Sequence, residues 1–458
     1  MKSTIFVVAA WALVSPIFAA AHAAERSPAA TSPLTLEQCT RLALKSAPEL
    51  GEAQADIEQT ASKLDEAKSY RFPRLEATAL FGPAPRAHKD ELFATDSSNV
   101  RLNNLTWFTS ADATIIQPLY TFGKISENMK AATHGIEVDR SRKEQRAQEI
   151  ALKVQEYYYG LLLARELKEL VLEVLDDLAR AHLAAQKLLE QGAESVDEND
   201  LYKLDAFSGE ASKYLAEAEK GEQLALAVLK ARLGLPPEAE LEISSRRLSM
   251  GEGGIADYDT LLARARERRP EFRQIAEGLK ARAALVEAAK ADYYPDLFLG
   301  GLFSWAYAAG RDRVDNPYIA DRFNHASGGI ALGARWKLDF GITAAKVAGE
   351  RAQYNRLLST RQYAETNIPL QLRKFYLEAK EAEKSVADTQ KAYSNAKKWA
   401  VSALANFDFG VGPAKEIFDA LQAYARMRAD YFQAIYNYRI AKANLDYACG
   451  ESPWANGK

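Results

Sequence analysis

Cysteine is scarce in this 458-residue chain, which has only two, and no motif of a familiar catalytic class is present. There is no phosphate-binding P-loop, no HExxH zinc motif and no GxSxG nucleophile turn. Charge of one sign is also lacking, because 59 Lys and Arg are mixed along the chain with 62 Asp and Glu. These absences argue against an enzyme, a bound metal or cofactor, and a nucleic-acid-binding surface.

The two cysteines, Cys39 and Cys449, lie near opposite ends of the chain. An oxidising compartment would allow them to form a disulfide. The alternative is that both are small buried side chains with no partner. The sequence leaves both interpretations open.

Long hydrophobic runs are missing as well. The first 23 residues have the features of a secretory signal peptide, with Lys2, an apolar run and a small-residue cleavage site that ends at Ala23. A membrane-crossing helix needs about 20 mostly apolar residues, and neither this run nor any later segment provides them. We therefore expect an exported chain that is periplasmic, secreted or an outer-membrane barrel, and hydropathy alone does not choose among these.

The chain repeats itself. Proline-centred motifs at Pro48 and Pro73 recur at Pro270 and Pro295, 222 residues later, and Gly192 has its counterpart at Gly410. Further matches, at offsets of 218 and 216, are Phe122-Gly123 with Phe340-Gly341 and Leu233-Gly234 with Cys449-Gly450. Repeats with conserved order and spacing indicate a duplicated unit. We divide the chain into a first repeat (24–235), a linker (236–257), a second repeat (258–450) and a tail (451–458).

Each repeat has the same predicted elements. A helix that ends at a proline is followed by two strands, a very long helix, a Gly-containing turn and a return helix. The expected strands lie at about 73–82, 107–120, 296–308 and 328–340; the long helices at 124–190 and 342–409; and the return helices at 200–233 and 414–447. The long helices have the 4-3 apolar spacing of a coiled coil, for example from Leu167 to Leu188. Pro369 interrupts the second of them and predicts a kink or a break there.

The strands indicate their surroundings. Apolar and polar residues alternate over about 10 positions, most clearly in 330–340, and aromatic residues lie near the ends of the strands. This pattern is typical of outer-membrane strands, and we expect these aromatic residues to anchor the barrel: Trp107, Trp305, Tyr307, Trp336 and Phe340. The alternative is a soluble sheet that packs its apolar face on helices. Four strands cannot close a barrel, so copies must share one. Two chains would give eight strands and three would give twelve; a wide interior favours twelve.

The chain resembles the TolC-like outer-membrane efflux family from Leu34 to Gly450. The motifs that carry this resemblance are Leu34–Gln38, Ala47–Leu50, Gln117–Gly123 and Leu233–Pro236. The resemblance implies an α+β membrane protein in the outer membrane, a homotrimer whose twelve strands form one barrel and whose long helices form a coiled-coil tunnel in the periplasm. It also implies a periplasmic adaptor protein and an inner-membrane pump of the RND or ABC type as partners.

The resemblance places the closed end of the tunnel at the turns between the long and return helices. Glu416 and Asp419 match the positions at which the family has paired aspartates, so three copies would form two acidic rings that act as a gate. The alternative is that acids in a first helical turn only favour the helix dipole. The tip turns that we expect to dock an adaptor contain Gly192, Asp200, Gly410, Gly412 and Pro413. Gly412-Pro413 departs from the family pattern, and the match of Asp200 is uncertain because the first turn is two residues longer.

Three functions remain open. The duct could export small molecules, or it could be the outer-membrane component of a type I protein secretion system. A soluble periplasmic coiled-coil scaffold is the alternative of a different class.

Overall fold

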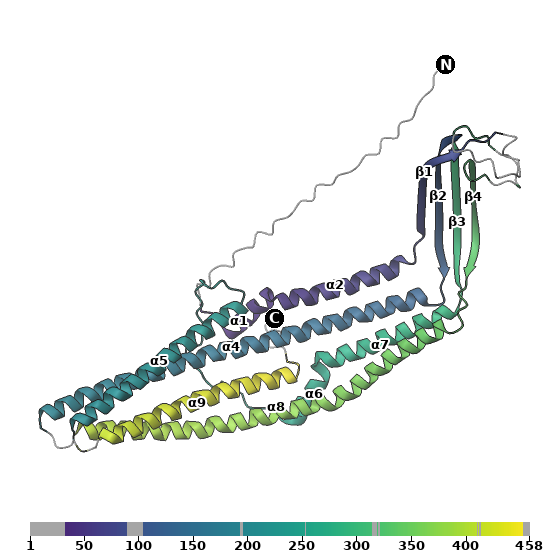
Figure 1. Cartoon of the computed structure of the whole chain (residues 1–458). Coiled ribbons are helices and arrows are strands. Elements are labelled where there is room, and N and C mark those ends of the chain that lie inside the picture. The colour runs from purple at the N-terminus through teal and green to yellow at the C-terminus, as the bar shows by residue number, and fades with distance from the viewer. Residues whose placement is uncertain are drawn as a thin grey trace.

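The computed structural model describes residues 33–451, apart from 89–103, 193–195, 252, 314–317, 319–320, 410 and 412–413. The expected signal peptide and all but the first residue of the expected tail lie outside this range. The molecule is elongated, and a small sheet projects from one end of a long layer of helices (Figure 1). Among the described helices, none combines the length and the hydropathy that a membrane-crossing helix requires.

The sheet is antiparallel and has four strands in chain order. These are β1 (Arg74–Pro85), β2 (Leu105–Tyr120), β3 (Asp296–Ala308) and β4 (His325–Arg335). The central pairing, β2 with β3, joins a strand of the first repeat to a strand of the second. β1 and β4 are the two edges, and neither pairs with another strand in the described part of the chain.

The last strand is shifted from its expected position. We expected strand residues at 328–340, but β4 begins at His325 and ends at Arg335. Its partner β3 begins at Asp296, opposite Arg335, so no backbone remains to pair beyond that point. The alternation of apolar and polar residues continues in the sequence beyond the last backbone pair of β4. For this reason we expected Trp336 and Phe340 within the strand, but both follow it. The other three strands lie close to their expected ranges.

Each strand is continuous in space with one helix, and the helices keep the order of the strands (Figure 1). β1 follows α2 (Pro48–Ser69), β2 leads into α4 (Lys124–Glu190), β3 follows α7 (Pro270–Lys290) and β4 leads towards α8 (Ile342–Asp408). A short 3-10 turn, η2 (Ala291–Tyr293), lies between α7 and β3. Helix α2 packs on α4, α4 on α7 and α7 on α8. The half of the helical region that is nearer the sheet is therefore one curved layer of four helices.

The half that is farther from the sheet contains the return helices. α5 (Glu198–Arg232) runs back along α4, and α9 (Ala414–Ala448) lies against both α8 and α4. The expected ranges agree with these helices within two residues. The predicted coiled-coil seam is also found, because Leu178, Ala181 and Ala185 of α4 are buried among apolar side chains of the other helices.

Pro369 does not break α8, which is continuous from Ile342 to Asp408. A proline at this position lacks the amide that would bond to the carbonyl four residues earlier. The local packing supports the helix here: the hydroxyl of Tyr258 donates a hydrogen bond of 3.1 Å to the carbonyl of Pro369, and the neighbouring Leu372 is fully buried. Tyr258 and Leu372 thus pack the helix into its surroundings next to the position where its own hydrogen-bond ladder lacks one bond.

Two short helices precede α2 and α7, namely α1 (Leu36–Ser46) and α6 (Tyr258–Arg268). In each repeat the end of the return helix docks on the junction after this short helix. Gly234, at the end of α5, lies against Ser46, and Gly450, at the end of α9, lies against the backbone of Arg268 and Arg269. The two glycines are equivalent in the repeats, and both have a positive φ that suits glycine.

The cysteines lie in these two docking regions. Cys39 packs with Leu229 and Leu233 in one buried cluster, and Cys449 packs with Leu261 and Leu445 in another. Leu261 is the repeat equivalent of Cys39, and Leu233 is that of Cys449, so each cysteine replaces a core leucine. Both thiols are free and buried. Burial raises the pKa of Cys39 to about 11 and that of Cys449 to about 12. The disulfide considered from the sequence is not formed, and the cysteines are small apolar core residues.

The segment that we expected to be a linker is packed against α4. The amide of Leu248 donates a 2.9 Å hydrogen bond to Glu166, and the hydroxyl of Tyr158 donates one of 2.9 Å to Ser245. Glu166 is only 2% exposed, and burial raises the pKa of its carboxyl group. This segment is therefore part of the packed structure beside α4 and not a free linker.

Candidate transport surface

One face of the sheet is apolar across all four strands. The register aligns Leu75, Ile115, Gly301 and Ile330 in a single row, and the next row contains Ala77, Ala113, Phe303 and Gly328. No helix packs on this face within the described residues, and Ile330 is 81% exposed. A continuous exposed apolar face is a surface for lipid or for another protein. The soluble-sheet alternative is wrong, because it required helices to cover this face.

The opposite face is more polar. Thr78, Asp112, Ser304 and Ser327 form one row across the four strands. Ser304 donates a 2.6 Å hydrogen bond to Asp112, and its oxygen lies 2.7 Å from Nε2 of His325. The sheet thus separates an apolar side from a side that can face water, as the alternation predicted.

Aromatic side chains gather near both ends of the apolar face. At the end far from the helices, Trp107 lies between Phe81 and Tyr307, with ring-centre distances of 6.3 and 5.7 Å. At the helical end, Phe122 stacks on Tyr294 at 5.0 Å. Trp107, Trp305 and Tyr307 were expected from the sequence to be anchors, without an end being assigned to them. Phe122 and Tyr294 were not expected to be anchors, and their contact depends on the juxtaposition of the two repeats.

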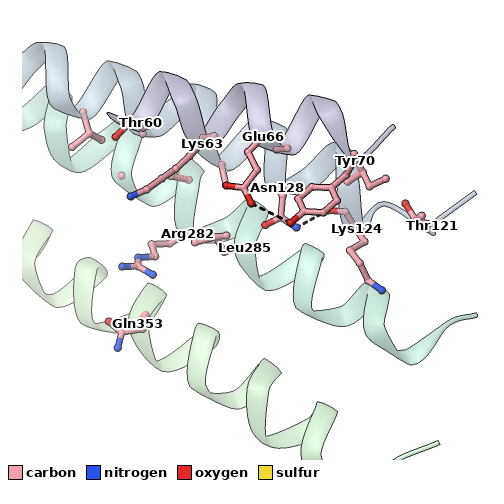
Figure 2. A pocket seen from close by; sticks show the side chains of 18 of the residues that line it. Thr60, Lys63, Glu66, Tyr70, Thr121, Lys124, Asn128, Arg282, Leu285 and Gln353 are labelled. Carbon is pink, nitrogen blue, oxygen red and sulfur yellow. Dashed lines mark hydrogen bonds between the residues drawn. The ribbon is translucent and has the colours of Figure 1, made fainter. Parts of the chain in front are cut away.

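A large cavity continues the polar face into the helical layer. Its volume is about 1300 Å³, and it lies against α2, α4, α7 and α8 at the base of the sheet (Figure 2). Lys124 lies at its upper rim and pairs with Asp292 and Asp296 at 3.0 Å each. Burial alone would lower the pKa of Lys124, but these two partners outweigh it and hold the pKa above its usual range. The sequence did not reveal this cavity, because its lining comes from four helices whose order was unknown.

The acidic residues expected at the tip differ in their surroundings. Glu416 lies in the first turn of α9, with Asp419 one turn later on the same face; the former is half-buried and the latter exposed. Asp200 accepts a hydrogen bond from the amide of Asp197 and donates its own amide to the Asp197 side chain, so it completes the capping box of Asp197, the N-cap of α5, and it also pairs with Lys203 at 3.0 Å. Gly192 ends α4 with φ of +71°. Gly410, Gly412 and Pro413 lie outside the described residues.

Two segments of the chain, 40–200 and 261–451, match the outer membrane efflux protein family. The chain belongs to this family. The match occurs once in each half, and it confirms the resemblance that the sequence motifs indicated. The family places this efflux protein in the outer membrane, with its helices in the periplasm.

Solved outer-membrane channels have the same fold. The chain is 16% identical to the channel OprN, with 91% of this chain and 90% of that chain covered and a TM-score of 0.74. It is 16% identical to VceC of Vibrio cholerae (91% and 96% covered, TM-score 0.71). It is 15% identical to the open state of the Neisseria gonorrhoeae channel MtrE (91% and 89% covered, TM-score 0.72). No curated protein matches the efflux protein significantly.

Proposed function

We propose that three copies of this efflux protein form a passive exit duct for small molecules across the outer membrane. The observation that carries the proposal is the sheet, which exposes a continuous apolar face to one side and a polar face to the other. In lipid, the unpaired edges β1 and β4 would leave backbone groups without partners, so each edge must pair with another copy. Three chains supply twelve strands around a water-filled interior.

The helices support the same assembly. The outward sides of α5 and α8 carry large apolar residues that stay exposed among the described residues, including Tyr202 and Leu224 on α5 and Tyr363 and Leu370 on α8. In a ring of copies, α5 of one chain would meet α8 of the next. Such a contact is heterologous and closes after a whole number of copies, as a cyclic trimer requires.

We assign the gate to the acidic turn at the start of α9. Three copies of Glu416 and Asp419 would form two stacked rings that attract cations and hinder anions. Glu416 also lies where a carboxylate favours the helix dipole, and that stabilising role needs no channel. The double variant Glu416→Gln with Asp419→Asn distinguishes the two, since only a gate predicts weaker block by divalent cations in planar bilayers.

The remaining assignments follow the assembly. The tip turns at Gly192 and Asp200, and at Gly410, Gly412 and Pro413, would receive the adaptor, and the aromatic anchors Trp107, Trp305 and Tyr307 would lie at a membrane interface. Trp336 and Phe340 follow β4 and are exposed at the helical end, where they suit the opposite interface. Residues 1–23 would direct export and then be removed. An inner-membrane pump of the RND or ABC type would supply the energy.

The decisive experiment is fractionation together with conductance. We expect a heat-resistant trimer in the outer-membrane fraction that conducts ions in a planar bilayer. A monomer that is extracted without detergent and conducts nothing would establish the scaffold alternative. Deletion of the gene then separates the cargo classes: increased sensitivity to toxic small molecules supports efflux, whereas unchanged sensitivity with loss of a secreted protein would favour type I secretion.

A further inference from the structure

The cavity at the base of the sheet is lined by one face of each helix. From α2 it receives Lys63, Ala67 and Tyr70, spaced by four and three residues, and from α8 it receives Arg356 and Thr360. Its strand residues, such as Arg74 and Arg335, belong to the polar face of the sheet. The cavity and the polar face are therefore one concave wall, and in the proposed duct this wall faces the bore.

The lining is unusually basic. Seven of its residues are Lys or Arg and three are Asp or Glu, although the chain as a whole has a formal charge of -3. Two of the three acids are already engaged: Asp139 pairs with Arg142 at 3.0 Å, and Asp296 pairs with Lys124. The third, Glu66, accepts a 3.1 Å hydrogen bond from the neutral hydroxyl of Tyr70. The charged residues of the lining therefore carry a formal excess of four positive charges, of which Asp292 and Glu350, outside the lining, offset two.

Four cations of the wall have no carboxylate within ion-pair distance in the part of the chain that the structure describes. They are Lys63, Arg74, Arg335 and Arg356, and all four are exposed. The guanidinium groups of Arg74 and Arg335 lie over the rings of Tyr70 and Phe298, at 4.8 and 5.4 Å, which holds their positions without neutralising them. Figure 2 shows that the side chains of Lys63 and Arg282 extend into the cavity. Arg282 pairs with Glu350 at 3.5 Å and is therefore not counted among these four.

We propose that this wall binds and concentrates anionic solutes that carry carboxylate or phosphate groups. The inference rests on the proposed function, because it requires that the wall faces a conducting bore. Arginine presents a planar fork of donors that matches both groups. In a narrow bore with walls of low dielectric constant, the field of such charges is focused, and three copies would triple the excess. The acids at the tip lie at the far end of the molecule and act on a different part of the path.

The test uses two variants with matched controls. Lys63→Gln with Arg356→Gln removes two of the unpaired charges of the wall. Lys68→Gln with Arg351→Gln removes the same charges five residues away on the same two helices, which places them on roughly the opposite face. All four residues are exposed, so neither change disturbs the core. Permeability is measured for the full-length trimer in a planar bilayer with a KCl gradient whose mean concentration is about 0.1 M, where the screening length is about 10 Å. Citrate is then added as a polyanionic probe.

We expect the permeability ratio of chloride to potassium to fall at least two-fold in the wall variant, with weaker block by citrate, and to stay unchanged in the control. Equal ratios and equal block in the wild type and both variants would overturn the inference while leaving the duct intact. An equal fall in both variants would also overturn it, because the effect would then reflect net charge and not the wall. A protein that conducts no current contradicts the proposed function itself.

Discussion

The two return helices have the same length, 35 residues, but very different surroundings. α9 lies between α8 and α4 and buries residues along its whole length, from Ile417 to Ala448. α5 packs mainly on α4, buries only Leu204, Ala211 and Leu229, and leaves its other side bare. The two return helices therefore differ in their packing: α9 packs on both α8 and α4, whereas α5 packs mainly on α4 and meets α9 where Phe207 stacks on Phe418.

This difference shows which surfaces of the single chain lack a packing partner among the described residues. The sheet edges and the outward side of α5 have no partner in the described chain, whereas α9 is enclosed by α8 and α4. Substitutions should therefore separate into two classes. Changes in α9 should affect the folding of the single chain, and changes in α5 or on the sheet should affect assembly and the membrane.

The largest expected effect comes from one substitution made in both return helices. Leu421→Ala in α9 empties a site that is 3% exposed, and it should lower the free energy of unfolding by about 2–5 kcal/mol. Leu224→Ala in α5, where the leucine is 63% exposed, should leave that free energy nearly unchanged and weaken the trimer instead. Urea unfolding measures the first effect, and the melting of the trimer on a gel measures the second. Equal loss of unfolding free energy in both variants would remove the distinction between the helices.

The next effect concerns the sheet. Ile330→Arg places a charge on the apolar face at the middle of β4, where it is expected to cost about 2–4 kcal/mol per chain if that point lies near the middle of the bilayer. Ala331→Arg makes the same addition on the polar face, one residue away. The first variant should be depleted from the outer membrane and the second should remain, as quantitative fractionation would show. Equal depletion would mean that the apolar face does not meet lipid.

A smaller effect separates the ionic contacts of the two helices with α4. In α9, Arg428 pairs with Glu173, which also accepts a 2.8 Å bond from Tyr424. In α5, Glu222 pairs with Arg165 and Lys168 at 3.1 Å each. Arg428 is 8% exposed, so Arg428→Met should lower the free energy of unfolding by about 2 kcal/mol. Glu222→Gln should lower it by less than about 1 kcal/mol, because that cluster is more exposed.

The pH dependence of these contacts has a defined sign. Burial raises the pKa of Glu173, but the hydrogen bonds from Arg428 and Tyr424 outweigh burial and the pKa lies below its usual value of 4.5. The contribution of Glu173 is therefore present above pH 4.5 and is lost as the pH falls through the lowered value. Urea midpoints of wild type and Arg428→Met should converge in acid, and a gap that persists there would contradict this assignment.

The smallest effect has the opposite sign. Asp446 lies near the end of α9, where the equivalent residue of α5 is Lys230. Burial, followed by the nearby charge of Glu451, raises the pKa of Asp446 to about 6. In the unfolded chain the carboxyl group of Asp446 ionises above pH 3.8, whereas in the folded chain it stays protonated up to about pH 6. The free energy of unfolding therefore falls between pH 3.8 and 6. Asp446→Asn should stabilise the protein by about 1–2 kcal/mol at pH 7 and have little effect at pH 4. A stabilisation that is equal at both pH values would show that the carboxyl group is not responsible.

The sequence predicted most of the fold because the repeats check each other. Landmarks such as Pro48 and Pro270 located the helices, and periodicity separated the strands from the coiled coils. The end of β4 was not predictable, since it depends on its tertiary partner, the start of β3. The continuity of α8 through Pro369 was not predictable either, because a proline can end a long helix or leave it continuous with one bond fewer. The tip acids were found through the resemblance, but the cavity was missed because cations such as Lys63 and Arg356 are 293 residues apart.

The one-to-one match of strands and helices limits what this protein could pass. Neighbouring strands are about 4.8 Å apart, whereas packed helices are about 8–10 Å apart, so equal numbers of each enclose unequal circumferences. Even with a strand tilt of about 40°, a closed ring of strands has a smaller circumference than a ring of the same number of helices. Above the tip, the narrowest rigid cross-section would therefore lie in the outer membrane, and any cargo that reaches that level must already fit through a bore sized by strands.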